Sequence, residues 1–139
     1  MKEIILEAKV EKLDDLLSFI DKELEEAGCG MKAQMKINLA AEEIFVNIAN
    51  YAYGSGDGEA KIRIETDGDA KRAEITFMDE GMPYNPLEKE DPDVTLPAEE
   101  RPIGGLGIYI VKKSMDEVTY KYEDGKNILS MMFLWGLIQ

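Results

Sequence analysis

Apolar and charged side chains alternate over residues 3–9, which predicts a strand at the start of the chain. Over residues 13–24 apolar side chains instead return at every third or fourth position, the spacing of a helix that buries one face. Two glycines within residues 28–30 interrupt this helix. A second, longer helix is predicted over residues 31–53, because that stretch contains neither glycine nor proline.

The second half of the chain contains two pairs of strand-like segments. Residues 60–66 and 73–78 form the first pair, and residues 117–122 and 127–134 form the second. Each pair is joined through an Asp-Gly step, which favours a hairpin and therefore antiparallel pairing. A short helix is predicted between the two pairs, over residues 106–115.

This order of elements predicts an α+β fold of one domain, residues 1–139. Three helices would cover one face of a mixed, mostly antiparallel sheet in a two-layer α/β sandwich. Residues 80–105 contain all five prolines among acidic residues and predict a long irregular loop, of the kind that usually forms a lid or a binding loop. The alternating order of a Rossmann sheet and the Walker motif are absent from the sequence, so a bound nucleotide would need another scheme.

The composition argues against several classes of partner and of catalytic or metal site. Sixteen basic against 29 acidic residues give a formal charge of −13, which repels phosphate backbones and anionic lipid, so neither a nucleic acid nor a membrane is expected as a partner. The sequence has no histidine, which excludes imidazole bases and histidine-containing zinc sites. Cys29 is the single cysteine, and the apolar runs are too short for a signal peptide or a membrane span, so a cytoplasmic protein is expected.

One candidate site lies on the long predicted helix. Glu43 and Asn47 are four residues apart, so they lie one turn apart on the same helix face, between apolar neighbours. The carboxylate could accept a proton, and the amide oxygen could bind a hard cation such as Mg²⁺. The same spacing also describes a helix edge that water merely wets, and the motif alone does not separate these interpretations.

A second candidate follows the strand predicted over residues 73–78. Asp79 stands at the end of this strand, where a carboxylate can accept a hydrogen bond from an exocyclic amine. Gly81 would let a flat ring lie against the backbone, because it has no Cβ. Asp-x-Gly is also an ordinary turn, so this motif too has a purely structural interpretation.

A third candidate is a glycine cluster that opens the helix predicted over residues 106–115. Free backbone N–H groups and the helix dipole make such a position favourable for a phosphate. A loop that needs positive φ would contain similar glycines. The residues at this position are Gly104, Gly105, Leu106 and Gly107.

In this order and spacing, the three sites resemble the asparagine box and the first two glycine boxes of the GHKL superfamily, the histidine-kinase-like ATPases. More narrowly, the chain resembles the bacterial anti-sigma-factor serine/threonine kinases. The resemblance implies ATP and Mg²⁺ as cofactors, Glu43 as catalytic base, Asn47 as nucleotide contact and Mg²⁺ ligand, and Asp79 as acceptor of the adenine amino group. It places Gly81 beneath the purine. The phosphate-side turn would consist of Gly104, Gly105, Leu106 and Gly107.

Two positions depart from the family pattern. Pro83 replaces the second glycine of Asp-x-Gly-x-Gly, a variant that resembles the regulatory-kinase branch. Tyr51 replaces the histidine or lysine often found four residues after the asparagine. The ATP lid would comprise about residues 86–104, and Arg101 could contact the terminal phosphate from it.

The resemblance implies an ATP-dependent protein serine/threonine kinase that acts as an anti-sigma factor. Its partners would be a sigma factor and a small anti-anti-sigma protein of the STAS type, whose serine or threonine would receive the γ-phosphate of Mg-ATP. A homodimer through the first strand or its helix would fit the same resemblance. The alternatives are a non-catalytic ATP-gated protein-binding regulator, the catalytic domain of a two-component histidine kinase acting in trans, and an α+β domain without a ligand.

Overall fold

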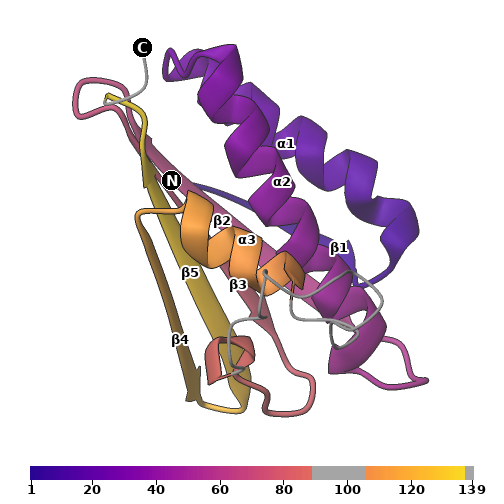
Figure 1. Ribbon diagram of the computed structural model, residues 1–139. Helices are drawn as coiled ribbons and strands as arrows, with labels where there is room; N and C mark the ends of the chain where they lie inside the picture. Colours follow the sequence, from indigo (N-terminus) through magenta and orange to yellow (C-terminus); the bar gives the residue numbers. More distant parts are fainter. Residues whose placement is uncertain (89–105, 137–139) are drawn as a thin grey trace.

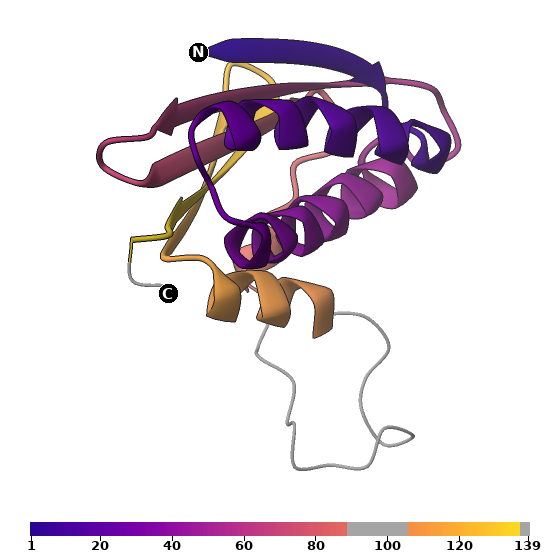
Figure 2. The same cartoon turned by 90° about the horizontal axis from the view of Figure 1, so that it is seen from above.

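The computed structural model of the protein describes residues 1–88 and 106–136. Within them, a five-stranded sheet has three α-helices on one face, so the molecule is a two-layer α+β sandwich, as predicted (Figures 1 and 2). The pairings between the described strands are all antiparallel, whereas a mixed, mostly antiparallel sheet was expected. None of the described helices is long and apolar enough to cross a lipid bilayer.

The predicted elements are found close to their predicted positions. In the sheet the strand order is β1-β2-β3-β5-β4. The strands are β1 (Lys2–Glu7), β2 (Glu59–Asp67), β3 (Arg72–Asp79), β4 (Glu117–Glu123) and β5 (Lys126–Leu134). The helices are α1 (Leu13–Glu26), α2 (Met31–Asn47) and α3 (Leu106–Ser114), and short 3-10 turns occupy Val10–Lys12 and Pro86–Glu88.

The long helix differs from its prediction at its C-terminal end. α2 ends at Asn47, and Ile48–Ala52 continue as a single turn of π-helix. In a π turn each bond reaches five residues back instead of four, so the turn is wider, and such turns are frequent at functional sites. The regular helix predicted over residues 31–53 was wrong here, because apolar spacing gives no sign of one extra residue in a turn.

The two Asp-Gly steps form different turns. Residues 124–125 make a two-residue hairpin with positive φ at both positions, 55° and 76°, the geometry that Asp-Gly favours. The other loop has four residues, 68–71, because Asp67 pairs with Arg72 across the strands. The Asp67 side chain accepts two backbone hydrogen bonds inside this loop. Both steps reverse the chain as predicted, with different loop lengths.

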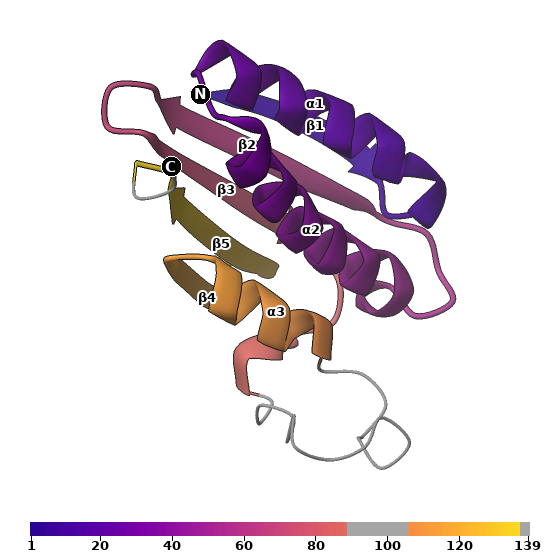
Figure 3. The ribbon, with the colours of Figure 1, turned by 45° about the horizontal axis from the view of Figure 1, so that its top comes forward.

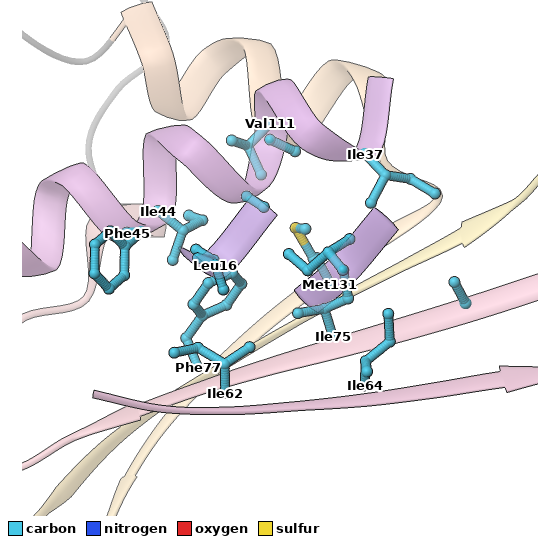
Figure 4. Packing of buried hydrophobic residues seen from close by; sticks show 14 of the residues in the cluster. Leu16, Ile37, Ile44, Phe45, Ile62, Ile64, Ile75, Phe77, Val111 and Met131 are labelled. Atoms are coloured by element: carbon cyan, nitrogen blue, oxygen red, sulfur yellow. The ribbon is translucent and has the colours of Figure 1, made fainter. Parts of the chain in front are cut away.

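The core lies between the helix layer and the sheet. Alternate residues of the central strands face the helices, and α2 lies between α1 and α3 in the helix layer (Figure 3). Figure 4 shows the most deeply buried of these side chains, which include Leu16, Ile37, Phe45, Ile62, Ile64, Ile75, Phe77, Val111 and Met131. At one end of this core the buried positions become polar, and the candidate site begins there.

Candidate functional site

A cavity of about 650 Å³ opens where the end of α2, the π turn, the ends of β3 and β5 and the start of α3 meet. Its walls are largely apolar, from side chains such as Ile44, Ile48, Phe77, Ile108 and Leu129. The polar side chains among them belong to Glu43, Asn47, Tyr51, Asp79, Tyr84, Tyr120 and Asn127. A mostly apolar cavity of this size with a few convergent polar groups is typical of a small-molecule site.

Glu43 and Asn47 line this cavity together, from successive turns of α2. Both side chains are half-buried, and neither makes a hydrogen bond or ion pair in the part of the chain that the structure describes. The predicted shared face is therefore confirmed, and it opens into a cavity. A carboxylate and an amide oxygen remain available to a ligand there.

The N-terminal turn of α3 lies against Glu43. A Cβ built at Gly107 would overlap the Glu43 carboxylate, so only glycine allows the two to approach this closely. This brings the start of α3, where free N–H groups favour anions, to the cavity. Leu106 is the first residue of the helix, whereas Gly104 and Gly105 lie outside the described residues, as do Arg101 and most of the predicted lid.

Asp79 is the buried carboxylate of the cavity, with 7% of its surface exposed. Its Oδ1 accepts hydrogen bonds from the backbone N–H of Gly81 and from Nδ2 of Asn127, both at 2.9 Å. Within residues 1–88 and 106–136 nothing donates to Oδ2. The two donors orient the carboxylate and leave Oδ2 as a free acceptor for a ligand.

The sequence analysis missed Asn127, which lies directly opposite Asp79 in the β3–β5 pair. Besides Asp79, its Nδ2 donates to the carbonyl of Met82 at 2.9 Å, and its Oδ1 accepts from the N–H of Tyr84 at 3.1 Å and from the Tyr120 hydroxyl. One amide thus positions both the buried carboxylate and the segment that follows β3. The alternation along β5 could have indicated its importance. Asn127 falls at one of the alternate positions of β5 that are buried, where an apolar residue is usual.

We expect Asn127→Ala to lower the free energy of unfolding by about 2 kcal/mol, because it removes one of the two donors to the buried Asp79 carboxylate and the side-chain donor to the Met82 carbonyl. Urea unfolding of the purified chain measures this loss. The control is Asn50→Ala, which removes an exposed asparagine and should change the value by less than about 0.5 kcal/mol. Equal losses in the two variants would contradict the positioning role of Asn127.

Gly81 faces the π turn. A Cβ at this position would overlap the backbone carbonyl of Ala52, and the next N–H, that of Met82, donates to the same carbonyl at 2.8 Å. Gly81 is not among the described residues that line the cavity. The structure therefore gives this glycine a packing reason, and its place beneath a purine stays a prediction.

Gly81→Ala should destabilise the fold by about 3 kcal/mol, because the new methyl group meets backbone that cannot move without breaking the Met82 bond. Gly30→Ala is the matched control. Gly30 is the N-cap of α2, with φ −73° and nothing within 4 Å of an added Cβ, so this change should cost at most about 1 kcal/mol. Chemical denaturation of both variants measures the difference, and similar midpoints would show that Ala52 yields to the methyl group.

Tyr53 holds the π turn against the sheet. Its hydroxyl donates to the carbonyl of Glu59 at 2.6 Å and accepts from the N–H of Glu80 at 2.9 Å. A Cβ at Gly58 would overlap the ring. Burial raises the pKa of the Tyr53 phenol, and the nearby Asp79 carboxylate adds to the rise.

The raised pKa predicts a loss of stability at alkaline pH. The unfolded phenol ionises near pH 10, so the stability that Tyr53 contributes is present below about pH 10 and is lost as the pH rises through the higher folded pKa. Tyr53→Phe should cost about 1 kcal/mol at pH 7 and make the decline above about pH 10 shallower. Urea unfolding at pH 7 and at a series of alkaline pH values measures both effects. Tyr51→Phe, which changes an exposed tyrosine, is the control. If the free energy of unfolding fell equally steeply with pH in Tyr53→Phe and in the unmodified chain, the raised pKa of Tyr53 would not be the cause of the alkaline loss.

The residues that the structure describes offer few ligands for a metal ion. In the described ranges, no three acidic or cysteine side chains come close enough to hold an ion by themselves. The amide oxygen of Asn47 is a hard ligand atom on the cavity wall, and no other described residue bonds to it. This donor set fits Mg²⁺, which usually takes one or two protein ligands and completes its shell with phosphate oxygens and water.

Comparison with known sequences supports the same architecture. The family model for the histidine kinase-like ATPase domain matches residues 6–133. The serine-protein kinases RsbW of Bacillus cereus (strain AH187) and Bacillus mycoides (strain KBAB4) are each 29% identical to this chain over 102 residues. The matches cover 70% of this chain and 62% of each relative, so the chain spans about three fifths of the length of these curated relatives.

Solved structures show the same fold. The crystal structure of the RsbU and RsbW domains of Rv1364c from Mycobacterium tuberculosis matches 96% of this chain and 32% of its own, with a TM-score of 0.62 at 12% identity. The histidine kinase domain from the Erythrobacter litoralis EL346 blue-light activated histidine kinase matches 89% of this chain and 59% of its own, with a TM-score of 0.55 at 16% identity. At these identities the likeness concerns the fold alone.

Proposed function

Because the chain belongs to the histidine kinase-like ATPase family, we propose that its cavity binds ATP and that the protein is a regulatory serine/threonine kinase of the anti-sigma-factor type. One observation supports this most strongly: Glu43, Asn47, Asp79 and Gly107, which come from three segments far apart in the sequence, line a single cavity. The serine-protein kinase name of the Bacillus relatives supports the same activity.

The adenine would occupy the end of the cavity near Asp79. The free Oδ2 is an acceptor for the exocyclic amino group, and its orientation is set by the two donors on Oδ1. Ile44, Ile48 and Leu129 supply apolar surface for a flat ring. A buried acceptor of this kind discriminates against a purine that presents a carbonyl at the same position, because two acceptors would then face each other.

The triphosphate would lie toward Asn47 and the first turn of α3. A chain of net charge −13 repels this anion, so the local donors must offset the repulsion. The N–H groups at the start of α3 supply part of that compensation. Mg²⁺, held by Asn47 together with phosphate oxygens and water, would supply the rest by neutralising phosphate charge.

Glu43 is the proposed general base, since its carboxylate lies on the cavity wall against Gly107 at the start of α3. In the transfer, a serine Oγ would form a bond to the γ-phosphorus while the bond from that phosphorus to the β–γ bridging oxygen breaks. The Oγ proton would pass to Glu43, and ADP would leave. This chemistry depends on position and charge more than on covalent intermediates, so a chain without histidine suffices.

The proposed partners are a sigma factor and a STAS-type anti-anti-sigma protein as phosphoryl acceptor, with the cytoplasm as the compartment and a homodimer as the assembly. The test uses γ-³²P-labelled ATP, the purified chain and a purified STAS-type protein from the same cells. Label on a serine or threonine of that protein supports the kinase. ATP-dependent complex formation without any label transfer would replace it with the non-catalytic ATP-gated regulator.

A further inference from the structure

Part of the helix layer has no acidic residue, in a chain that is otherwise strongly acidic. Residues 31–41 of α2 and 106–115, which include α3, contain four lysines and none of the 29 acidic residues of the protein. The two helices pack against each other in the layer (Figure 3). The acid-free segment of α2 ends at Glu42 and Glu43, of which Glu43 lines the cavity, and Asp21 of α1 borders this segment through its hydrogen bond from Asn38.

An apolar ridge runs along this surface. Met31, Met35 and Leu39 recur every four residues, so they lie on successive turns of α2, and 79%, 60% and 55% of their surfaces are exposed. The ridge is about 12 Å long, the length of roughly two helical turns. Exposed apolar residues are ordinary when scattered, but a continuous row marks a contact surface, and methionine adapts readily to different partners.

Exposed lysines border the ridge. Lys36 lies seven residues before Glu43 and therefore on nearly the same side of α2, the side that contacts α3 at Gly107. In the part of the chain that the structure describes, Lys32 and Lys36 form no ion pair, although carboxylates are abundant elsewhere. Lys113 of α3 is also exposed, with its Nζ 5.6 Å from the centre of the Tyr109 ring.

We propose that this surface docks an acidic amphipathic helix of a partner protein. The docking surface, here named the α2–α3 patch, consists of Met31, Lys32, Met35, Lys36 and Leu39 of α2, with the exposed Lys113 on the helix that packs beside α2. A partner helix with apolar residues at helical spacing would pack along the ridge, and its carboxylates would meet the unpaired lysines. Outside the acid-free segments the chain has 12 basic against 29 acidic residues, so on balance it repels such a helix, and the charge distribution favours binding at the patch.

The neighbouring helix favours a narrow protein partner over a membrane or a nucleic-acid duplex. α1 lies on the other side of α2 from α3 (Figure 3), and it contains six acidic residues and a single lysine. A flat anionic bilayer or a duplex resting on α2 would also meet these carboxylates. A single helix, about 10 Å wide, can lie over α2 and α3 alone.

The proposal does not rest on nucleotide binding. None of the patch residues lines the cavity, and the patch ends on α2 at Leu39, before Glu43. Docking should therefore be measurable with the full chain in the absence of ATP. A chain that failed to bind ATP could therefore still bind the partner helix, and a chain that failed to bind the helix could still bind ATP.

Methionine methyl groups provide the test. The full chain, labelled with ¹³C at its methionine methyls, is titrated with a synthetic 18-residue helical peptide that has leucines along one face and glutamates elsewhere. Shifts of the Met31 and Met35 signals, with the buried Met131 signal unchanged, are the expected result. Lys32→Glu with Lys36→Glu should weaken binding at least tenfold. Lys61→Glu with Lys121→Glu, the same charge change on β2 and β4, should leave affinity within twofold.

The unchanged Met131 signal in both double variants shows that they are folded. The proposal would be overturned by Met31 and Met35 signals that the peptide does not move, by equal affinity in the two double variants, or by equal binding of a peptide with lysines in place of the glutamates. Phosphatidylglycerol vesicles or a DNA duplex that moved these two signals more than the acidic peptide would also overturn it, because the patch would then serve a different class of partner.

Discussion

Asp79→Asn is expected to weaken ATP binding about 100-fold, or roughly 2.7 kcal/mol. The reason is geometric. Two donors, the Gly81 N–H and the Asn127 amide, hold the Oδ1 position, so the oxygen of an introduced amide must occupy it. The amide NH₂ then takes the Oδ2 position and faces the adenine amino group, donor against donor. Isothermal titration calorimetry with Mg-ATP measures the loss.

Asp57→Asn is the matched control, because it makes the same charge change at a carboxylate that is 91% exposed. It should leave the affinity for ATP within about twofold, since Asp57 does not line the cavity and an exposed charge is largely screened by salt. Circular dichroism establishes that both variants retain the native fold before affinities are compared. Unchanged affinity in a folded Asp79→Asn variant would show that adenine does not contact this carboxylate.

Glu43→Gln is expected to reduce the rate of phosphoryl transfer by about 1,000-fold, within the range that a general base contributes. Glutamine keeps the shape of the side chain and its contact with Gly107 but cannot accept the hydroxyl proton. ATP affinity should change by less than about threefold, because the lost interaction belongs to the transition state and not to the bound substrate. Initial rates with γ-labelled ATP and calorimetry separate these two quantities.

Glu42→Gln gives the comparison for this variant. Glu42 precedes Glu43 on α2 and carries the same charge, but it is not among the described residues that line the cavity. Its rate should stay within twofold of the unmodified chain. A Glu43→Gln variant that transferred phosphate as fast as Glu42→Gln would show that another group accepts the proton.

Most of the fold could be predicted from the sequence, because each element follows from local spacing. The alternation over residues 3–9 and in the two hairpins gave the five strands, and the glycine-free stretch from residue 31 gave the long helix. The shared cavity of Glu43, Asn47 and Asp79 also agrees with the sequence, since the family resemblance supplied the long-range part. Periodicity alone could place Glu43 and Asn47 together, but not Asp79 with them.

The remaining features depend on contacts between distant elements. Asn127 is important because strand register puts it opposite Asp79, 48 residues away, and an isolated asparagine after a turn gives no indication of that pairing. Gly81 is required because a π turn brings the carbonyl of Ala52 against it. The acid-free segments of α2 and α3 were likewise visible in the sequence, but only the helix packing joins them into one surface.

A crystal structure of the chain with Mg²⁺ and a non-hydrolysable ATP analogue tests the central claim most directly. The predicted result is an adenine amino group within hydrogen-bonding distance of Asp79 Oδ2, with the triphosphate between Asn47 and the first turn of α3. A purine bound elsewhere, or phosphates remote from Asn47, would contradict the assignment of this cavity as the nucleotide site.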